Sequence, residues 1–216
     1  MLATATTLLR DQMTWRRARL ACGLVMFTYL ALHFAMHASG LWSFDAMQRA
    51  THLHDAVWHS KPGTWTLYGA FAIHFSLGLY ALFARRSFRM GASELARLVL
   101  GFSIVPLIAH HFSSGRYVWS VYGVEGRYDV LLPAYFSIVP MWGWVQVTAM
   151  LVTWTHGCLG IHLWLRERTW YPRVASALLV LAVLWAVLPR VMNRVDDSPR
   201  NPPPPDEEEA EAKGGR

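Results

Sequence analysis

Charged residues are scarce in this chain. They make up 16% of its 216 residues, whereas soluble domains carry about 25%. The charges also gather in a few places, which leaves long apolar runs between them. This distribution argues against a soluble domain and predicts a membrane protein.

Cysteine is also rare. Cys22 and Cys158 are the only two, and both lie inside apolar runs. They exclude a disulfide framework and the cysteine spacing of a zinc or iron–sulfur site. The net charge of +6 reflects arginines at the ends of apolar runs, as membrane topology requires. No nucleic-acid motif accompanies it, and we expect no nucleic-acid partner.

Five apolar runs approach the roughly 20 residues that a membrane span needs. They are residues 20–38, 64–84, 95–112, 142–165 and 174–188. We therefore predict an all-α membrane protein, a bundle of about five transmembrane helices in contact with the lipid bilayer. A segment at 1–19 precedes the membrane domain at 20–190, and a Pro- and Glu-rich tail at 191–216 follows it and is expected to be disordered.

The arginines predict the orientation of the bundle. Eleven arginines fall in the N-terminal segment and the short connections, against four Lys or Arg in the two longer connections. Positive residues are enriched on the cytoplasmic side. The N-terminus is therefore predicted to be cytoplasmic, and the connections at about 39–63 and 113–141 are predicted to lie outside. His52, His54 and His59 fall in the first of these and are expected to be solvated.

Histidines are concentrated in the first four predicted helices. Seven of the ten lie in these helices or at their ends: His33, His37, His74, His110, His111, His156 and His162. Ionisable residues at membrane depth are costly and usually functional. The fifth predicted helix has none, so the site is expected in a four-helix core.

Four of these histidines form two pairs that match in depth. His33 and His111 each lie 14 residues beyond an arginine on helices that run outward. His74 and His156 lie 11 and 10 residues before an arginine on helices that run inward. A haem iron with two axial imidazoles needs them at one level, facing each other. The pairs predict two b-type haems, with these four residues as the metal ligands.

Neighbouring residues leave alternatives open. His37 lies one turn beyond His33 and could replace it as ligand or contact a propionate or a quinone. His110 could take the place of His111. Arg116, just beyond these, could pair with a haem propionate.

The second and fourth predicted helices share the pattern His-x-x-Leu-Gly. It places Gly78 and Gly160 one turn below His74 and His156. Glycine there would let a flat macrocycle or a neighbouring helix approach the backbone closely. The repeated pattern is what duplication of a helix pair would leave.

Several stretches resemble a known family of membrane anchors. They are Leu-His-Phe-Ala-Met-His-Ala-Ser-Gly-Leu at 32–41, Pro-Leu-Ile-Ala-His-His at 106–111, Tyr-Gly-Val-Glu at 122–125 and His-Gly-Cys-Leu-Gly-Ile-His-Leu-Trp-Leu-Arg at 156–166. Over about residues 16–190 the chain resembles the membrane anchor of bacterial class III adenylate cyclases, which is similar to the dihaem cytochrome b subunit of succinate dehydrogenase and fumarate reductase.

The resemblance implies a helical bundle in the bacterial inner membrane that exchanges electrons with membrane quinone. It implies that His33, His74, His111 and His156 hold two b haems. The chain also departs from the family. Cyclase anchors usually have six helices followed by a cyclase domain, whereas here about 22 residues of tail follow Arg194. An output activity is expected on a separate partner or through a homodimer, and no catalytic residue is assigned.

Three hypotheses follow. The first is a dihaem cytochrome b that acts as a redox-sensing or electron-transfer module for a separate partner. The second is the cytochrome b subunit of a succinate dehydrogenase-like complex. The third is a haem-free membrane protein whose histidines bind zinc or relay protons.

Each haem level would offer one quinone site. The outer site, beside His37 and Arg116, is favoured because a long connection could cover it.

Overall fold

The structure is a computed structural model, and it describes residues 2–85, 87–123, 131 and 134–182. Every regular element within these residues is helical, and none of them forms a strand. The prediction of an all-helical chain is therefore confirmed for the described residues. The predicted tail at 191–216 lies outside them.

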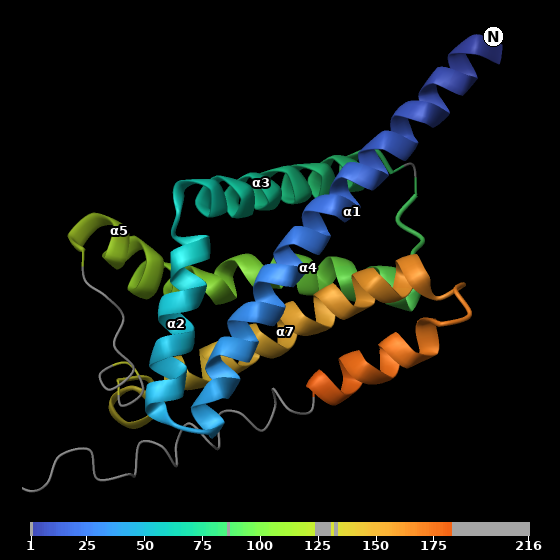
Figure 1. The fold of residues 1–216 in the computed structure, drawn as a ribbon. Helices are drawn as coiled ribbons and strands as arrows, with labels where there is room; N and C mark the ends of the chain where they lie inside the picture. Colours follow the sequence, from blue (N-terminus) through green and yellow to red (C-terminus); the bar gives the residue numbers. More distant parts are fainter. Residues whose placement is uncertain (1, 86, 124–130, 132–133, 183–216) are drawn as a thin grey trace, which may run out of the picture.

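Four long helices build the molecule: α1 (Leu2–Ala38), α3 (Lys61–Phe83), α4 (Ala92–Phe112) and α7 (Pro140–Leu165). α1 packs against α3, and α4 packs against α7. A smaller contact between α1 and α7 joins the two pairs. Figure 1 shows α3, α4 and α7 running in roughly similar directions and α1 crossing them at an angle, with α2 and α5 at one end and the short connections at the other.

The length and composition of three helical stretches suit a membrane span: Thr14–Leu41, Lys61–Phe83 and Ala92–Tyr122. They contain the first and third predicted spans, and the second except for its last residue, Ala84. α7 is 26 residues long but is not among the three, and it is interrupted by polar residues that include Gln146, Thr153 and His156. A shorter apolar helix follows at Tyr171–Ala182, and the rest of the predicted fifth span lies beyond the described residues.

Helix boundaries follow local sequence signals. Ser60 caps α3 by accepting a hydrogen bond from the N–H of Gly63 at 3.1 Å, and Pro62 lies in the first turn, where its missing N–H costs nothing. Between α3 and α4 the Arg85 guanidinium lies 3.2 Å from the Glu94 carboxylate. This ion pair ties the two helices together at the end where the connections are short.

The connections at the opposite end are more helical than the sequence predicts. α2 (Phe44–Trp58) occupies the connection between α1 and α3, and the side chain of Ser43 caps it by accepting from the N–H of Ala46. α4 continues through a π-helical turn, η2 (Ser113–Tyr117), into α5 (Val118–Tyr122). A second π-helical turn, η3 (Ala134–Ile138), precedes α7. These elements cover the end of the bundle where two of the histidine-bearing helices finish.

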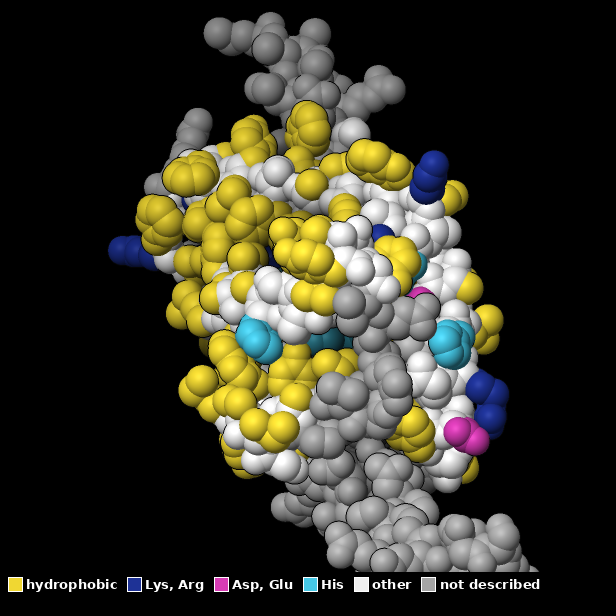
Figure 2. All heavy atoms as spheres, turned by 90° about the vertical axis from the view of Figure 1, so that its left-hand side faces the viewer, with side chains coloured by type: hydrophobic (Ala, Val, Ile, Leu, Met, Phe, Trp, Pro, Cys, Tyr) yellow, Lys and Arg dark blue, Asp and Glu magenta, His cyan; other side chains and the backbone are white. Residues whose placement is uncertain are grey.

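The surface carries large hydrophobic side chains that a soluble protein would bury. Trp42, Trp65 and Trp144 are 80%, 78% and 72% exposed at the end that holds α2. Trp15 and Trp164 are about half exposed toward the other end. Figure 2 looks onto the first of these ends and shows hydrophobic side chains over much of it, with Lys, Arg and acidic side chains at the rim. Two groups of tryptophans near the ends of apolar helices match the aromatic belts of membrane proteins.

Candidate functional site

A large, partly open cavity lies between the four long helices. Its volume is about 1960 Å³, and all four predicted ligands line it: His33, His74, His111 and His156. Typical small-molecule sites measure about 300–1000 Å³, and protein interiors are otherwise closely packed. Side chains therefore leave the centre of the bundle unfilled.

His74 of α3 and His156 of α7 form the inner pair. Their ring centroids lie 6.3 Å apart, and the ring planes are 79° apart. Two metal–nitrogen bonds of about 2.0–2.1 Å along one line place two imidazole centroids roughly 6 Å apart. The separation of the inner pair thus fits two axial ligands on one iron.

The hydrogen bonds of the inner pair fix which ring nitrogen faces the cavity. Nδ1 of His74 donates to the carbonyl oxygen of Arg19 at 2.9 Å, and Nδ1 of His156 donates to the carbonyl oxygen of Arg97 at 3.0 Å. A carbonyl oxygen only accepts, so each Nδ1 carries the proton and each Nε2 keeps a free lone pair. Metal-binding histidines are commonly held in this way.

Two glycines make these contacts sterically possible. A Cβ added to Gly23 would lie 3.1 Å from Cε1 of His74, and one added to Gly101 would lie 2.8 Å from Cε1 of His156. Each imidazole therefore packs directly on the backbone of the neighbouring helix. Neither glycine was predicted as part of the site.

A sequence signal for these glycines exists in the repeat. Arg19-Leu-Ala-Cys-Gly23 and Arg97-Leu-Val-Leu-Gly101 share the pattern Arg-Leu-x-x-Gly. In each helix another predicted ligand, His33 or His111, follows ten residues after the glycine. Comparison of the two 14-residue intervals would have found them. The α1–α3 pair and the α4–α7 pair thus repeat the same arrangement of carbonyl, glycine and histidine.

His33 of α1 and His111 of α4 form the outer pair. Their ring centroids lie 5.7 Å apart, with the planes again 79° apart. Nε2 of His37 lies 3.2 Å from Nε2 of His33, so His37 shares this end of the cavity rather than facing lipid. Nδ1 of His33 is buried and has no hydrogen-bond partner among the described residues. The outer pair thus lacks the backbone anchor that holds the inner pair.

His110 points away from the outer pair. Its ring stacks on Trp142 with centroids 3.7 Å apart and planes only 11° apart, and Tyr135 packs edge-on against it. Of the two neighbouring histidines, the structure brings only His111 into ring contact with His33.

Arg116 lies on η2, just beyond the outer pair. One of its terminal nitrogens donates to Oγ1 of Thr64 at 2.7 Å, and the guanidinium lies 4.8 Å from the ring of Trp119. The other terminal nitrogen is buried and has no partner among the described residues. A buried cationic nitrogen of this kind calls for an anionic partner.

α2 brings a further histidine to the outer pair. His54 was expected in a solvated loop, but its side chain is only 7% exposed, and its ring lies 5.3 Å from that of His33. The prediction of solvation is wrong for His54, because α2 folds over the end of the cavity. Nδ1 of His54 and Nε2 of His59 lie 3.0 and 3.5 Å from the same oxygen of Asp55. Burial lowers the pKa of His59, and the Asp55 carboxylate opposes this shift.

Gly78 and Gly160 both line the cavity. A Cβ added to either would meet nothing within 4 Å. They therefore border open space in the cavity rather than a closely approaching helix.

No three His, Cys, Asp or Glu side chains are grouped so as to hold a metal ion within the described part of the chain. Comparison with known proteins finds no match among family models, curated proteins or solved structures.

Proposed function

We propose that this chain is a dihaem membrane cytochrome b that exchanges electrons with membrane quinone and serves as the anchor or redox-sensing module of a separate partner. One observation carries the proposal. Two pairs of imidazoles face each other across a cavity of about 1960 Å³, and each half of the molecule supplies one member of each pair.

His74 and His156 would hold the inner haem, and His33 and His111 the outer one. The residues present fit this cofactor: the ring separations suit one iron, Gly78 and Gly160 border open space, and the Arg116 nitrogen that has no partner among the described residues suits a propionate. A haem iron with two imidazole ligands takes up and gives up one electron at a time. Oxidation of one quinol would deliver one electron to each of the two irons and two protons to water.

The geometry of the inner pair favours haem over zinc and over a proton relay. Zinc usually takes three or four protein ligands, whereas no third His, Cys, Asp or Glu is grouped with the inner histidines among the described residues. A proton relay needs hydrogen bonds that run from one titrating group to the next. In the inner pair each Nδ1 is instead bonded to a backbone carbonyl of a neighbouring helix, which fixes the ring and does not pass the proton on.

The proposal includes the membrane arrangement. Four helices would form the haem core, and the helix that begins at Tyr171 would add a fifth. Arginines such as Arg85 and Arg97 at the end with short connections support a cytoplasmic N-terminus in a bacterial inner membrane. The resemblance to cyclase anchors supports a sensor, and that to succinate dehydrogenase subunits supports a respiratory role. The partner would be a soluble protein on the cytoplasmic side or a second copy of the chain.

A reduced-minus-oxidised difference spectrum of the purified full chain tests the proposal. We expect the signature of two b haems per chain, with His156→Ala retaining one. His162→Ala is the matched control on the same helix and should retain both. A wild-type protein that carries zinc, or neither metal, after expression with ample haem would refute the proposal.

A further inference from the structure

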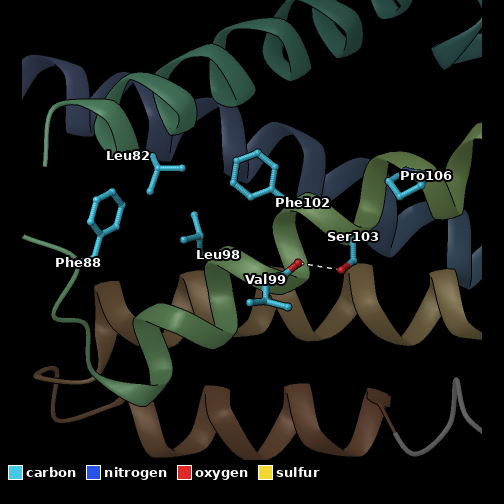
Figure 3. A pocket seen from close by; sticks show the side chains of 7 residues that line it. All are labelled: Leu82, Phe88, Leu98, Val99, Phe102, Ser103 and Pro106. Atoms are coloured by element: carbon cyan, nitrogen blue, oxygen red, sulfur yellow. Dashed lines mark hydrogen bonds between the residues drawn. The ribbon is translucent and has the colours of Figure 1, made fainter.

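Buried polar atoms that lack a partner gather at the end of the molecule that holds α2. Five side chains each have one buried nitrogen without a hydrogen-bond partner in the described part of the chain: His33, His54, His110, Arg116 and Gln146. Toward the other end, the groove between α3 and α4 in Figure 3 is apolar, and its one hydroxyl, that of Ser103, donates to the carbonyl oxygen of Val99 at 2.9 Å. A buried polar group without a partner is costly and calls for an explanation.

Two of these five nitrogens belong to neighbouring imidazole rings. They are Nδ1 of His33 and Nε2 of His54, and the ring centroids of the two residues lie 5.3 Å apart. Two imidazoles joined by one N–H···N hydrogen bond of about 3 Å have their centroids roughly 5 Å apart. The separation of the rings therefore suits a hydrogen bond between these two nitrogens.

Asp55 determines the role of each nitrogen of His54. Nδ1 of His54 lies 3.0 Å from Oδ1 of Asp55. A carboxylate only accepts, so Nδ1 of the neutral ring carries the proton and Nε2 keeps a lone pair. The His54 side chain is only 7% exposed, because α2 lies over the end of the cavity. Nε2 of His54 is thus a buried acceptor that needs a donor.

Ligation of iron would make His33 that donor. An imidazole that binds iron through Nε2 carries its proton on Nδ1, and metal-binding histidines almost always donate this N–H to a partner. In the inner pair, His74 and His156 donate theirs to backbone carbonyl oxygens. Nδ1 of His33 has no such partner among the described residues. The donor and the acceptor that each lack a partner therefore belong to adjacent rings.

We propose that His54, held by Asp55, accepts the Nδ1–H of His33 and orients this histidine as an axial ligand of the outer iron. The inference rests on the proposed function and adds a positioning residue from α2, outside the four-helix core. A partner of this kind raises the basicity of the ligand. A more basic ligand favours the more highly charged ferric iron, so His54 would lower the midpoint potential of the outer haem.

The geometry assigns His54 to this role rather than to iron itself. His33 is in ring contact with both His111 and His54, with centroids 5.7 Å and 5.3 Å away, so His33 joins the opposite half of the molecule to α2. Nε2 of His37 lies 3.2 Å from Nε2 of His33, which is the nitrogen that iron would take. Nδ1 of His33 is left for His54.

A redox titration of the purified full chain tests the inference with two substitutions of similar size. His54→Leu removes the acceptor, whereas the amide oxygen of His54→Gln can still accept from His33. Both lose the bond to Asp55, so the acceptor is what separates them. We expect His54→Leu to shift the outer haem about tenfold toward the ferrous form, which raises its midpoint potential by about 59 mV. His54→Gln should lie closer to wild type, and the inner haem should not change.

His52→Leu is the matched control on the same helix. His52 is exposed, and its Nε2 lies 3.4 Å from the side-chain nitrogen of Gln48, so both potentials should match wild type. The His156→Ala variant, which should retain only the outer haem, assigns the potentials. Loss of the outer haem in His54→Leu but not in His54→Gln would also support the inference, because it shows that the acceptor holds the ligand in place.

Three results would overturn the inference. Equal potentials in His54→Leu and His54→Gln would show that no acceptor is needed, and with both haems bound they would leave the proposed function intact. Loss of the outer haem in both variants, as expected for His33→Ala, would make His54 a ligand. Wild-type protein without haem would refute the proposed function and the inference together.

Discussion

Replacing Gly101 with alanine tests the inner pair through a residue that would not itself touch iron. The new methyl carbon would lie 2.8 Å from Cε1 of His156. To reach about 3.5 Å, where carbon contacts become favourable, the ring must move by roughly 0.7 Å. Ligand distances in metal sites hold to within about 0.2 Å. The ring must therefore leave its place between the Arg97 carbonyl and the inner site.

Gly23→Ala should act on the same haem more weakly. Its methyl carbon would lie 3.1 Å from Cε1 of His74, so the required shift is roughly half as large. Disturbing the group that orients a metal-binding histidine typically lowers metal affinity about 10–100-fold. We expect Gly101→Ala near the upper end of this range and Gly23→Ala near the lower end, with the outer haem retained in both.

Haem titration of the purified protein, followed by the absorbance of the bound cofactor, measures both affinities. Gly69→Ala is the control, since its added Cβ would meet nothing within 4 Å. Overpacking alone costs about 1–3 kcal/mol of stability, and thermal unfolding of each variant accounts for that cost separately. Two haems bound with wild-type affinity in Gly101→Ala would show that His156 is not a ligand.

Other substitutions separate the individual roles. His74→Ala and His156→Ala should each remove the same haem, because one axial ligand holds a b haem poorly, and difference spectra that lose different haems would disprove the pairing. His33→Ala should remove the other haem while His37→Ala keeps both, and the reverse result would make His37 the ligand. Arg116→Gln should keep both haems but lower the midpoint potential of the outer one, since a nearby cation favours the reduced form; a redox titration with an unchanged potential would place the propionates elsewhere.

The helices and the depth of the histidines could be predicted because both follow from distance along the chain. Each residue of a helix advances by about 1.5 Å, so equal intervals from Arg19 and Arg97 put His33 and His111 at one level. The start of the first helix was predicted less well. α1 begins at Leu2, and its basic segment continues the helix beyond its neighbours (Figure 1).

Contacts between helices could not be predicted in the same way. Successive residues of a helix point about 100° apart, so the choice between His110 and His111 depends on how α4 is rotated against α1 and α7. The Arg97 carbonyl and Gly101 meet His156 because of the relative register of two helices. The burial of His54 depends on α2 lying over the end of the bundle. None of these follows from spacing in the sequence.

The division into two helix pairs has a consequence for biogenesis. Within each pair the helices pack closely, but the contacts between the pairs are smaller: the packing of α1 on α7 and the Arg85–Glu94 ion pair between α3 and α4. Under the proposed function, each iron takes one ligand from the α1–α3 half and one from the α4–α7 half. Each bound haem would then stabilise the association of the two halves, which is weak without haem. A ligand that binds only the associated halves adds its binding free energy to the stability of that state. The amount of mature protein in the membrane would follow the haem supply of the cell, and chains made during haem shortage would be exposed to membrane proteases.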